Sequence, residues 1–162
     1  MNETQKRDAR PPRRILRGLT LGALALVMII QVVPYGRSHQ NPAVRKEPPW
    51  DSQQTRALAF RACYDCHSNQ SVWPWYSHLA PISWLIQHDV DEGRRELNFS
   101  EWDTPQREAG EAAKTVQKGE MPLWIYSLIH PHARLSSSER ASLIRGLDAT
   151  MGQSGERRPA NE

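Results

Sequence analysis

The chain has very little cysteine, and its two copies stand close together. Cys63 and Cys66 are the only cysteines among the 162 residues. This excludes the disulfide framework that staples many small secreted domains, and a bridge across two residues would add little stability. A structural zinc site needs four ligands. No second pair at that spacing is present, because His130 and His132, the only close histidines, are one residue apart.

The chain also lacks an excess of either charge beyond its first segment. The formal net charge is +3, but residues 37–162 hold 15 Lys and Arg against 16 Asp and Glu. A near-neutral surface gives no electrostatic footprint for DNA or RNA, so no nucleic-acid partner is expected. The positive charge is concentrated in residues 1–17, where six basic residues stand against two acidic ones.

Residues 18–36 contain no charged residue at all. As a helix this run would be about 28 Å long, near the ~30 Å thickness of the hydrocarbon core of a bilayer. It therefore predicts a single transmembrane anchor. Because the basic flank is N-terminal, the rest of the chain should lie on the outer side of the membrane, in the periplasm of a Gram-negative cell. The alternative is a cleaved signal peptide, although the run is long for one and no clear A-x-A site follows it.

His67 directly follows the second cysteine, so residues 63–67 read C-Y-D-C-H. C-x-x-C-H is the attachment signature of c-type haem. The two thiols form thioethers with one haem, and the adjacent imidazole becomes the proximal ligand of the iron. A thioredoxin-like redox pair would need a preceding strand, whereas residues 53–62 have a helical pattern. A covalent haem c agrees with the predicted location, since c-type haem is attached on the outer side of the bacterial inner membrane.

Helical patterns dominate the remaining chain, and no run alternates strictly enough to predict a strand. Caps and stop signals predict helices over residues 53–66, 81–97, 105–118 and 136–151. Apolar stripes are expected on the second helix (Ile82, Leu85 and Ile86) and on the fourth (Leu143, Ile144 and Leu147). The absence of an internal repeat indicates one haem. The economical fold is an all-α domain with long loops around a single flat cofactor.

These patterns divide the chain into five parts. The spacer is rich in proline and has little apolar periodicity, and the last residues have the composition of a disordered tail. In order, the predicted parts are a basic cytoplasmic N-terminus (1–17), the transmembrane anchor (18–36), a Pro-rich linker (37–51), the haem domain (52–152) and the tail (153–162).

The second axial ligand of the iron is predicted to be Met121. Met and His are the usual choices, and the other methionines are the initiator, one in the predicted anchor and one in the last helix turn. Gly119 lets the chain turn before Met121, and Pro122 stiffens the backbone after it. His130 or His132 is the alternative ligand, and ordinary core packing is the alternative role of Met121.

The chain resembles a known family in two stretches. They are "CYDCHSNQSVWPWYSHLAPISWLIQHDVDEGRRELNFSEW" and "GEMPLWIYSLIHPHARLSSSE". Together they are similar to the bacterial haem-binding domain family, whose members resemble single-haem class I cytochromes c. The resemblance covers roughly residues 52–150. It implies a cytochrome c-like helical fold, thioethers at Cys63 and Cys66, His67 as proximal ligand and Met121 as distal ligand. It implies no particular redox partner.

Further polar contacts to the haem are expected between the motif and Met121. The free N–H of a ligating imidazole normally donates to a carbonyl, and the backbone of residues 73–75 is a candidate acceptor. The haem propionates need donors, for which the candidates are Trp84, Arg94, Arg95, Asn98 and Trp102. A solvated helix end is the alternative role for the two arginines.

The expected function is electron transfer by a membrane-anchored single-haem cytochrome at the periplasmic face. An iron with His and Met on its two faces has no open position for a substrate, so the protein is expected to be a carrier rather than an enzyme. Its partner would be a redox protein held near the same membrane. The alternative is a haem-based sensor that binds a small ligand when Met121 is absent from the iron. A peroxidase would need distal acid–base groups, and no Arg–His pair stands out.

Overall fold

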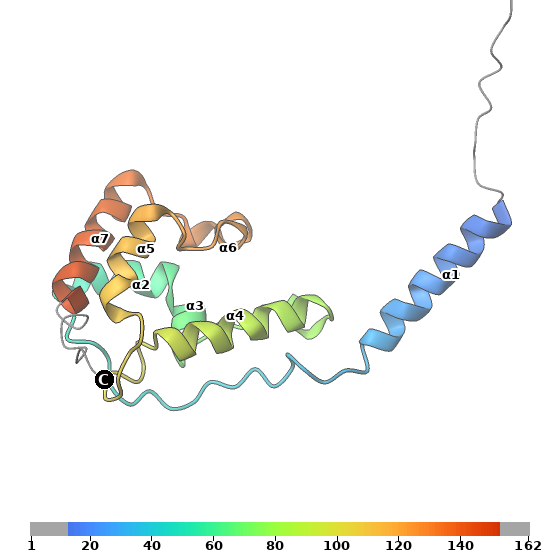
Figure 1. The fold of residues 1–162 in the computed structure, drawn as a ribbon, viewed down its shortest axis with the longest axis horizontal. Coiled ribbons are helices and arrows are strands. Elements are labelled where there is room, and N and C mark those ends of the chain that lie inside the picture. The colour runs from blue at the N-terminus through green and yellow to red at the C-terminus, as the bar shows by residue number, and fades with distance from the viewer. Residues whose placement is uncertain (1–12, 153–162) are drawn as a thin grey trace, which may run out of the picture.

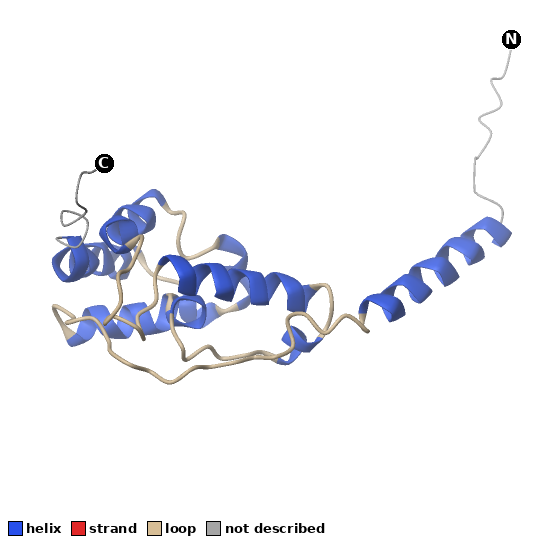
Figure 2. Cartoon of the chain, turned by 60° about the horizontal axis from the view of Figure 1, so that its bottom comes forward, coloured by secondary structure: helices blue, strands red, loops and turns tan. Residues whose placement is uncertain are grey.

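The computed structural model describes residues 13–152 and contains helices and loops (Figures 1 and 2). The predicted tail and most of the predicted basic N-terminus lie outside this range. Within it there is no strand, only one isolated bridge between Lys46 and Glu101. The prediction of an all-α domain is confirmed. The α-helices are α1 (Arg13–Ile30), α2 (Gln53–Ala62), α3 (Tyr64–His67), α4 (Ile82–Glu96), α5 (Ala112–Lys118), α6 (Trp124–Ile129) and α7 (Ser137–Met151). Short 3-10 turns are η1 (Trp75–His78), η2 (Ala109–Glu111) and η3 (Pro131–Ala133).

Local capping signals set the ends of several helices. The Ser52 side chain accepts from Thr55 N–H at 3.1 Å and starts α2. Ser136 and Glu139 form the predicted capping box at the start of α7. At the other end of α5, Gly119 takes the left-handed conformation (φ 77°) that ends the helix. The sequence therefore places these three ends correctly.

The predicted helix over residues 105–118 is wrong in its first half. Residues 103–108 are not helical, and the α-helix begins only at Ala112. The cause is the side chain of Gln106, which accepts from Asn98 N–H at 2.7 Å and donates to the carbonyl of Glu101 at 2.9 Å. These bonds to an earlier loop replace the first helical turn, although Pro105 is well suited to begin a helix.

The core lies where α2, α5 and α7 pack together around the loop after α4. Its largest fully buried side chains include Tyr64, Phe99, Leu143 and Met151. Gly146 on α7 lets α2 approach very closely, because a Cβ at this position would lie 1.9 Å from Thr55 Oγ1. The predicted stripe of α7 faces this core: Leu143 and Leu147 are buried in it and Ile144 packs against it.

Helix α1 stands apart from the haem domain (Figure 1). It corresponds to the predicted anchor of residues 18–36, but it begins earlier, at Arg13, and ends at Ile30. None of its residues is buried, and its leucines, Ile15, Ile29 and Met28 are exposed. In the part of the chain that the structure describes, no helix combines the length and the apolar character needed to cross a membrane.

Residues 36–46, here called the N-terminal strap, begin at the last residue of the predicted anchor and continue into the predicted linker. They run along the domain beneath α4 in Figure 1. The strap has no helix, yet it is bound throughout its length. Arg45 N–H and Lys46 N–H donate to Ser100 O at 2.8 and 3.1 Å, and Trp102 N–H donates to Lys46 O. Near its start, Gly36 lies so close to α4 that a Cβ would be 2.3 Å from Ser83 O.

Candidate haem site

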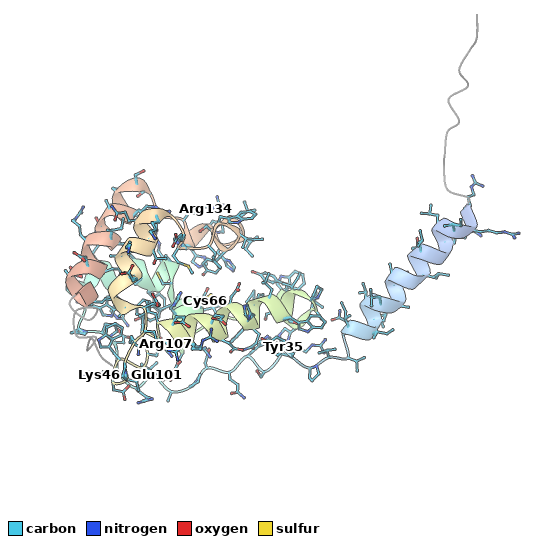
Figure 3. All side chains as sticks on the ribbon, viewed as in Figure 1. Tyr35, Lys46, Cys66, Glu101, Arg107 and Arg134 are labelled. Atoms are coloured by element: carbon cyan, nitrogen blue, oxygen red, sulfur yellow. The ribbon has the colours of Figure 1, made fainter. Side chains whose placement is uncertain are left out.

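The C-x-x-C-H motif lies at the junction of α2 and α3. Cys63 ends α2, and α3 holds the other four residues of the motif. Tyr64, between the cysteines, is buried in the core and stacks on Phe99 with ring centroids 5.4 Å apart. The buried ring of Tyr64 thereby fixes the motif to the core on one side, and the other side of the motif faces a cavity. Figure 3 shows Cys66 beside α4, on the side toward α6.

Two adjoining cavities open beside the motif, with volumes of about 440 and 480 Å³. The first is lined by Cys63, Cys66, His67 and Met121, so the four residues predicted to hold the haem border one space. The second lies toward η1 and the start of α4, and is mostly apolar. The two cavities share Asp65, Cys66, Asp89 and Tyr126 in their walls.

His67 is held in one orientation by the end of α4. Its Nδ1 lies 3.1 Å from Gly93 O and 3.0 Å from Leu97 O. Burial lowers the pKa of His67, so the ring is neutral at physiological pH. Since carbonyls only accept, Nδ1 carries the proton and Nε2 keeps its lone pair. The prediction that residues 73–75 supply this acceptor is wrong, because the last turn of α4 lies closer.

Gly93 makes this arrangement possible. A Cβ at Gly93 would lie 2.5 Å from Cys66 O and 2.9 Å from its carbonyl carbon. Only glycine therefore allows the backbones of α3 and α4 to approach so closely. Because Gly93 also presents one of the two carbonyls to His67, the same contact brings the motif and its acceptor together.

The chemistry of these side chains fits a covalently attached haem. Both cysteines are free. Burial raises the pKa of each thiol to about 12, so both are protonated at neutral pH. Two thiols, a neutral imidazole with a free lone pair and a thioether thus line a largely apolar space. When bound, a haem c would supply redox chemistry at its iron.

The structure distinguishes the three candidates for the distal ligand by the cavity that each one borders. Met121 borders the same cavity as His67, and His130 borders only the second one. Both ring nitrogens of His130 already have partners: Nδ1 lies 3.1 Å from Tyr126 O, and Nε2 lies 3.1 Å from Tyr76 Oη. His132 borders neither cavity.

A family model described as a haem-binding domain matches residues 25–149. The chain belongs to this haem-binding domain family. No curated protein matches it, and no solved structure does. The matched range begins inside α1 and includes the strap, so the family unit extends beyond the predicted haem domain of residues 52–152.

Five residues predicted as contacts of the haem propionates do not border either cavity of this haem-binding domain. Three of them make polar contacts elsewhere. Arg94 donates to Ser68 O, Ser71 Oγ and two groups of the strap, Gln40 O and Asn41 Oδ1. Arg95 pairs with Glu92 and Glu96, and Asn98 bonds to Asn69. Trp84 and Trp102 are likewise absent from the cavity walls.

Two features of the cavity walls escape sequence reasoning. Trp73 lines the second cavity, and its indole Nε1 is buried without a hydrogen-bond partner within residues 13–152. An indole N–H can only donate a hydrogen bond. The first cavity is bordered by carboxylates instead, among them Asp89, Glu92, Glu96 and Glu108. The Trp-Pro-Trp run of residues 73–75 does not indicate by itself that Trp73, and not Trp75, borders a cavity.

Proposed function

We propose that this haem-binding domain is a c-type cytochrome that transfers electrons through one covalently bound haem. Cys63 and Cys66 would form the thioethers, with His67 and Met121 as axial ligands. The supporting observation is that all four side chains border one cavity. A second support is the pair of carbonyls that fixes the proton of His67 on Nδ1 and leaves Nε2 for iron.

The carrier proposal follows from the ligand set. An iron bound by both His and Met has no open position, so it exchanges electrons without binding a substrate, and Met ligation raises its potential. We further propose that the uncharged run of residues 18–36, part of which forms α1, anchors the protein in the bacterial inner membrane, with the domain at the periplasmic face. In support, the apolar side chains of α1 are exposed along its length. A large exposed apolar surface is typical of a site that contacts a membrane or another protein. A redox protein at the same membrane would be the partner.

The haem attachment and its distal ligand are tested on the full chain expressed with haem. Haem should stay with the polypeptide after acid–acetone extraction and denaturing electrophoresis. Met121→Ala should abolish the sulfur–iron charge-transfer band, lower the potential and speed the binding of carbon monoxide. A fall of ~100 mV in this one-electron couple corresponds to about 2.3 kcal/mol. Met28→Ala, at an exposed methionine of α1, is the matched control.

Two results would change the proposal. Loss of haem on denaturation refutes covalent attachment. Rapid binding of carbon monoxide by the wild-type protein, unchanged in Met121→Ala, refutes Met ligation and favours the sensor. The anchor is tested separately, by following the full chain in membrane fractions and its cleavage by protease from the outer side. A mature soluble form that begins near residue 40 would identify the N-terminal segment as a signal peptide.

A further inference from the structure

Helix α6 directly follows the loop that contains Met121, but its side chains are not packed into the hydrophobic core. It begins three residues after Met121, and none of its residues is buried. Trp124, Leu128 and Ile129 are exposed. Apolar burial therefore contributes little to fixing α6 against the domain. Its position depends on the polar groups that connect it to neighbouring segments.

One of these connections reaches the haem attachment motif itself. The hydroxyl of Tyr126 donates to Asp65 Oδ2 at 2.6 Å, across 61 residues of chain. Burial and the nearby carboxylate of Asp65 raise the pKa of Tyr126, so the hydroxyl remains a donor at physiological pH. A short bond to an ionised acceptor is among the stronger hydrogen bonds in proteins.

Asp65 is a firm attachment point for this bond. Its Oδ1 accepts from Val72 N–H at 3.0 Å, and its backbone carbonyl accepts from Ser71 Oγ at 2.6 Å. Asp65 also lies between Cys63 and Cys66, so it cannot move without moving the attachment motif. Both Asp65 and Tyr126 border both cavities, at the place where the two cavities adjoin.

A second connection joins α6 to η1. His130 Nδ1 faces the Tyr126 carbonyl, which can only accept, so Nδ1 is the donor and Nε2 accepts from the hydroxyl of Tyr76. The His130 ring stacks on Tyr126 with centroids 4.2 Å apart. The stacked His130 ring supports the aromatic ring of Tyr126, while the bond to Asp65 connects Tyr126 to the motif.

We propose that the Tyr126–Asp65 hydrogen bond is a clamp that holds the Met121 loop against the haem attachment motif and so keeps the thioether of Met121 on the iron. The clamp rests on the proposed function, because it presupposes a haem with Met121 as ligand. Tyr126 and Asp65 are positioning residues in this arrangement. Opening the clamp lets α6 and the preceding loop move away together, which exposes the distal face of the iron.

The test uses the haem-loaded full chain and the Tyr126→Phe variant, which removes only the hydroxyl. Tyr35→Phe, which removes a hydroxyl from a residue that is 47% exposed, is the matched control. Stopped-flow binding of carbon monoxide to the ferrous protein reports how often Met121 leaves the iron. We expect an acceleration of about tenfold or more in Tyr126→Phe, and each tenfold corresponds to ~1.4 kcal/mol. The sulfur–iron band should weaken, while covalent haem and helix content stay as in the wild type.

A double-mutant cycle with Asp65→Ala separates the clamp from general loosening. If the bond is the cause, the double variant binds carbon monoxide no faster than the faster of the two single variants. Equal rates in wild type and Tyr126→Phe, with the sulfur–iron band intact, overturn the clamp and leave the His/Met cytochrome standing. Rapid binding already in the wild type, without a sulfur–iron band, overturns the clamp together with the assignment of Met121.

Discussion

The substitution Gly93→Ala tests the closest backbone approach in the haem site. The added methyl would lie 2.5 Å from Cys66 O and 2.9 Å from the carbonyl carbon, whereas ordinary contacts of a Cβ lie at 3.4–4 Å. These atoms belong to the backbone of the attachment motif and cannot turn aside as the end of a side chain can. Helix α4 must therefore move away from α3.

Two opposing effects determine how much Gly93→Ala changes the free energy of unfolding. Forcing a methyl into a tightly packed contact typically costs about 1–3 kcal/mol. Replacing glycine by alanine inside a helix returns up to about 1 kcal/mol. The free energy of unfolding should therefore fall by roughly 1–2 kcal/mol. In addition, Gly93 O is 3.1 Å from His67 Nδ1, so the displacement lengthens a bond that orients the proximal ligand.

The assay is guanidinium unfolding of the haem-loaded protein, combined with its absorption spectrum. The midpoint should drop in Gly93→Ala, and the low-spin spectrum should change. Gly22→Ala, at a helical glycine of α1 whose Cβ would meet nothing within 4 Å, is the control for helix propensity alone. If Gly93→Ala instead unfolds at or above the wild-type midpoint with an unchanged spectrum, the close approach of α3 and α4 does not limit this site.

Two further predictions concern the surroundings of the site. Arg94→Ala removes four hydrogen bonds, two of which hold the strap at Gln40 O and Asn41 Oδ1, so limited proteolysis should cut residues 36–46 faster than in the wild type. Arg94→Lys should not restore protection, because an ammonium group lacks the planar fork of donors. Glu139, whose pKa is lowered to about 2 mainly by its bond to Arg61, should stabilise the fold above pH 4.5, and this stabilisation is lost as pH falls toward 2. Thermal melts should show that Glu139→Gln flattens the pH dependence of stability in that window, and an unchanged slope would contradict the assignment.

Local sequence signals predicted the helices well where the cap and the stop lie within the element. The starts of α2 and α7 follow from Ser52 and from the capping box at Ser136, and the end of α5 follows from Gly119. The motif and Met121 were found because their chemistry is carried by residue type and order. Their meeting in one cavity agrees with that reading.

Features decided by distant backbone atoms were not predictable in this way. The acceptors of His67 are two backbone carbonyls, 26 and 30 residues further along the chain. Every residue has a backbone carbonyl, so the sequence does not indicate which one will accept from His67. The strap looked like a free linker because Pro42 and the polar residues around it show no apolar periodicity. It is held instead by backbone N–H groups that donate to Ser100 O, an acceptor that only the fold supplies. The stripe of Ile82 and Leu85 was expected to pack, but both side chains are about half exposed and border the second cavity.

The docked strap also changes how the haem centre would search for a partner. A free chain of this length would have a root-mean-square span of about 20 Å, and it would let the domain sample many orientations. Instead, Gln31 at the end of α1 bonds to both the N–H and the carbonyl of Ala80, and the following residues lie along the domain. The distance and the angle between α1 and the cavity mouth are thereby fixed. Inserting residues before Gln31 would move the whole unit, whereas inserting them within the strap would first have to break its bonds. An encounter with the proposed redox partner would then depend on the one orientation in which these bonds hold the domain relative to α1.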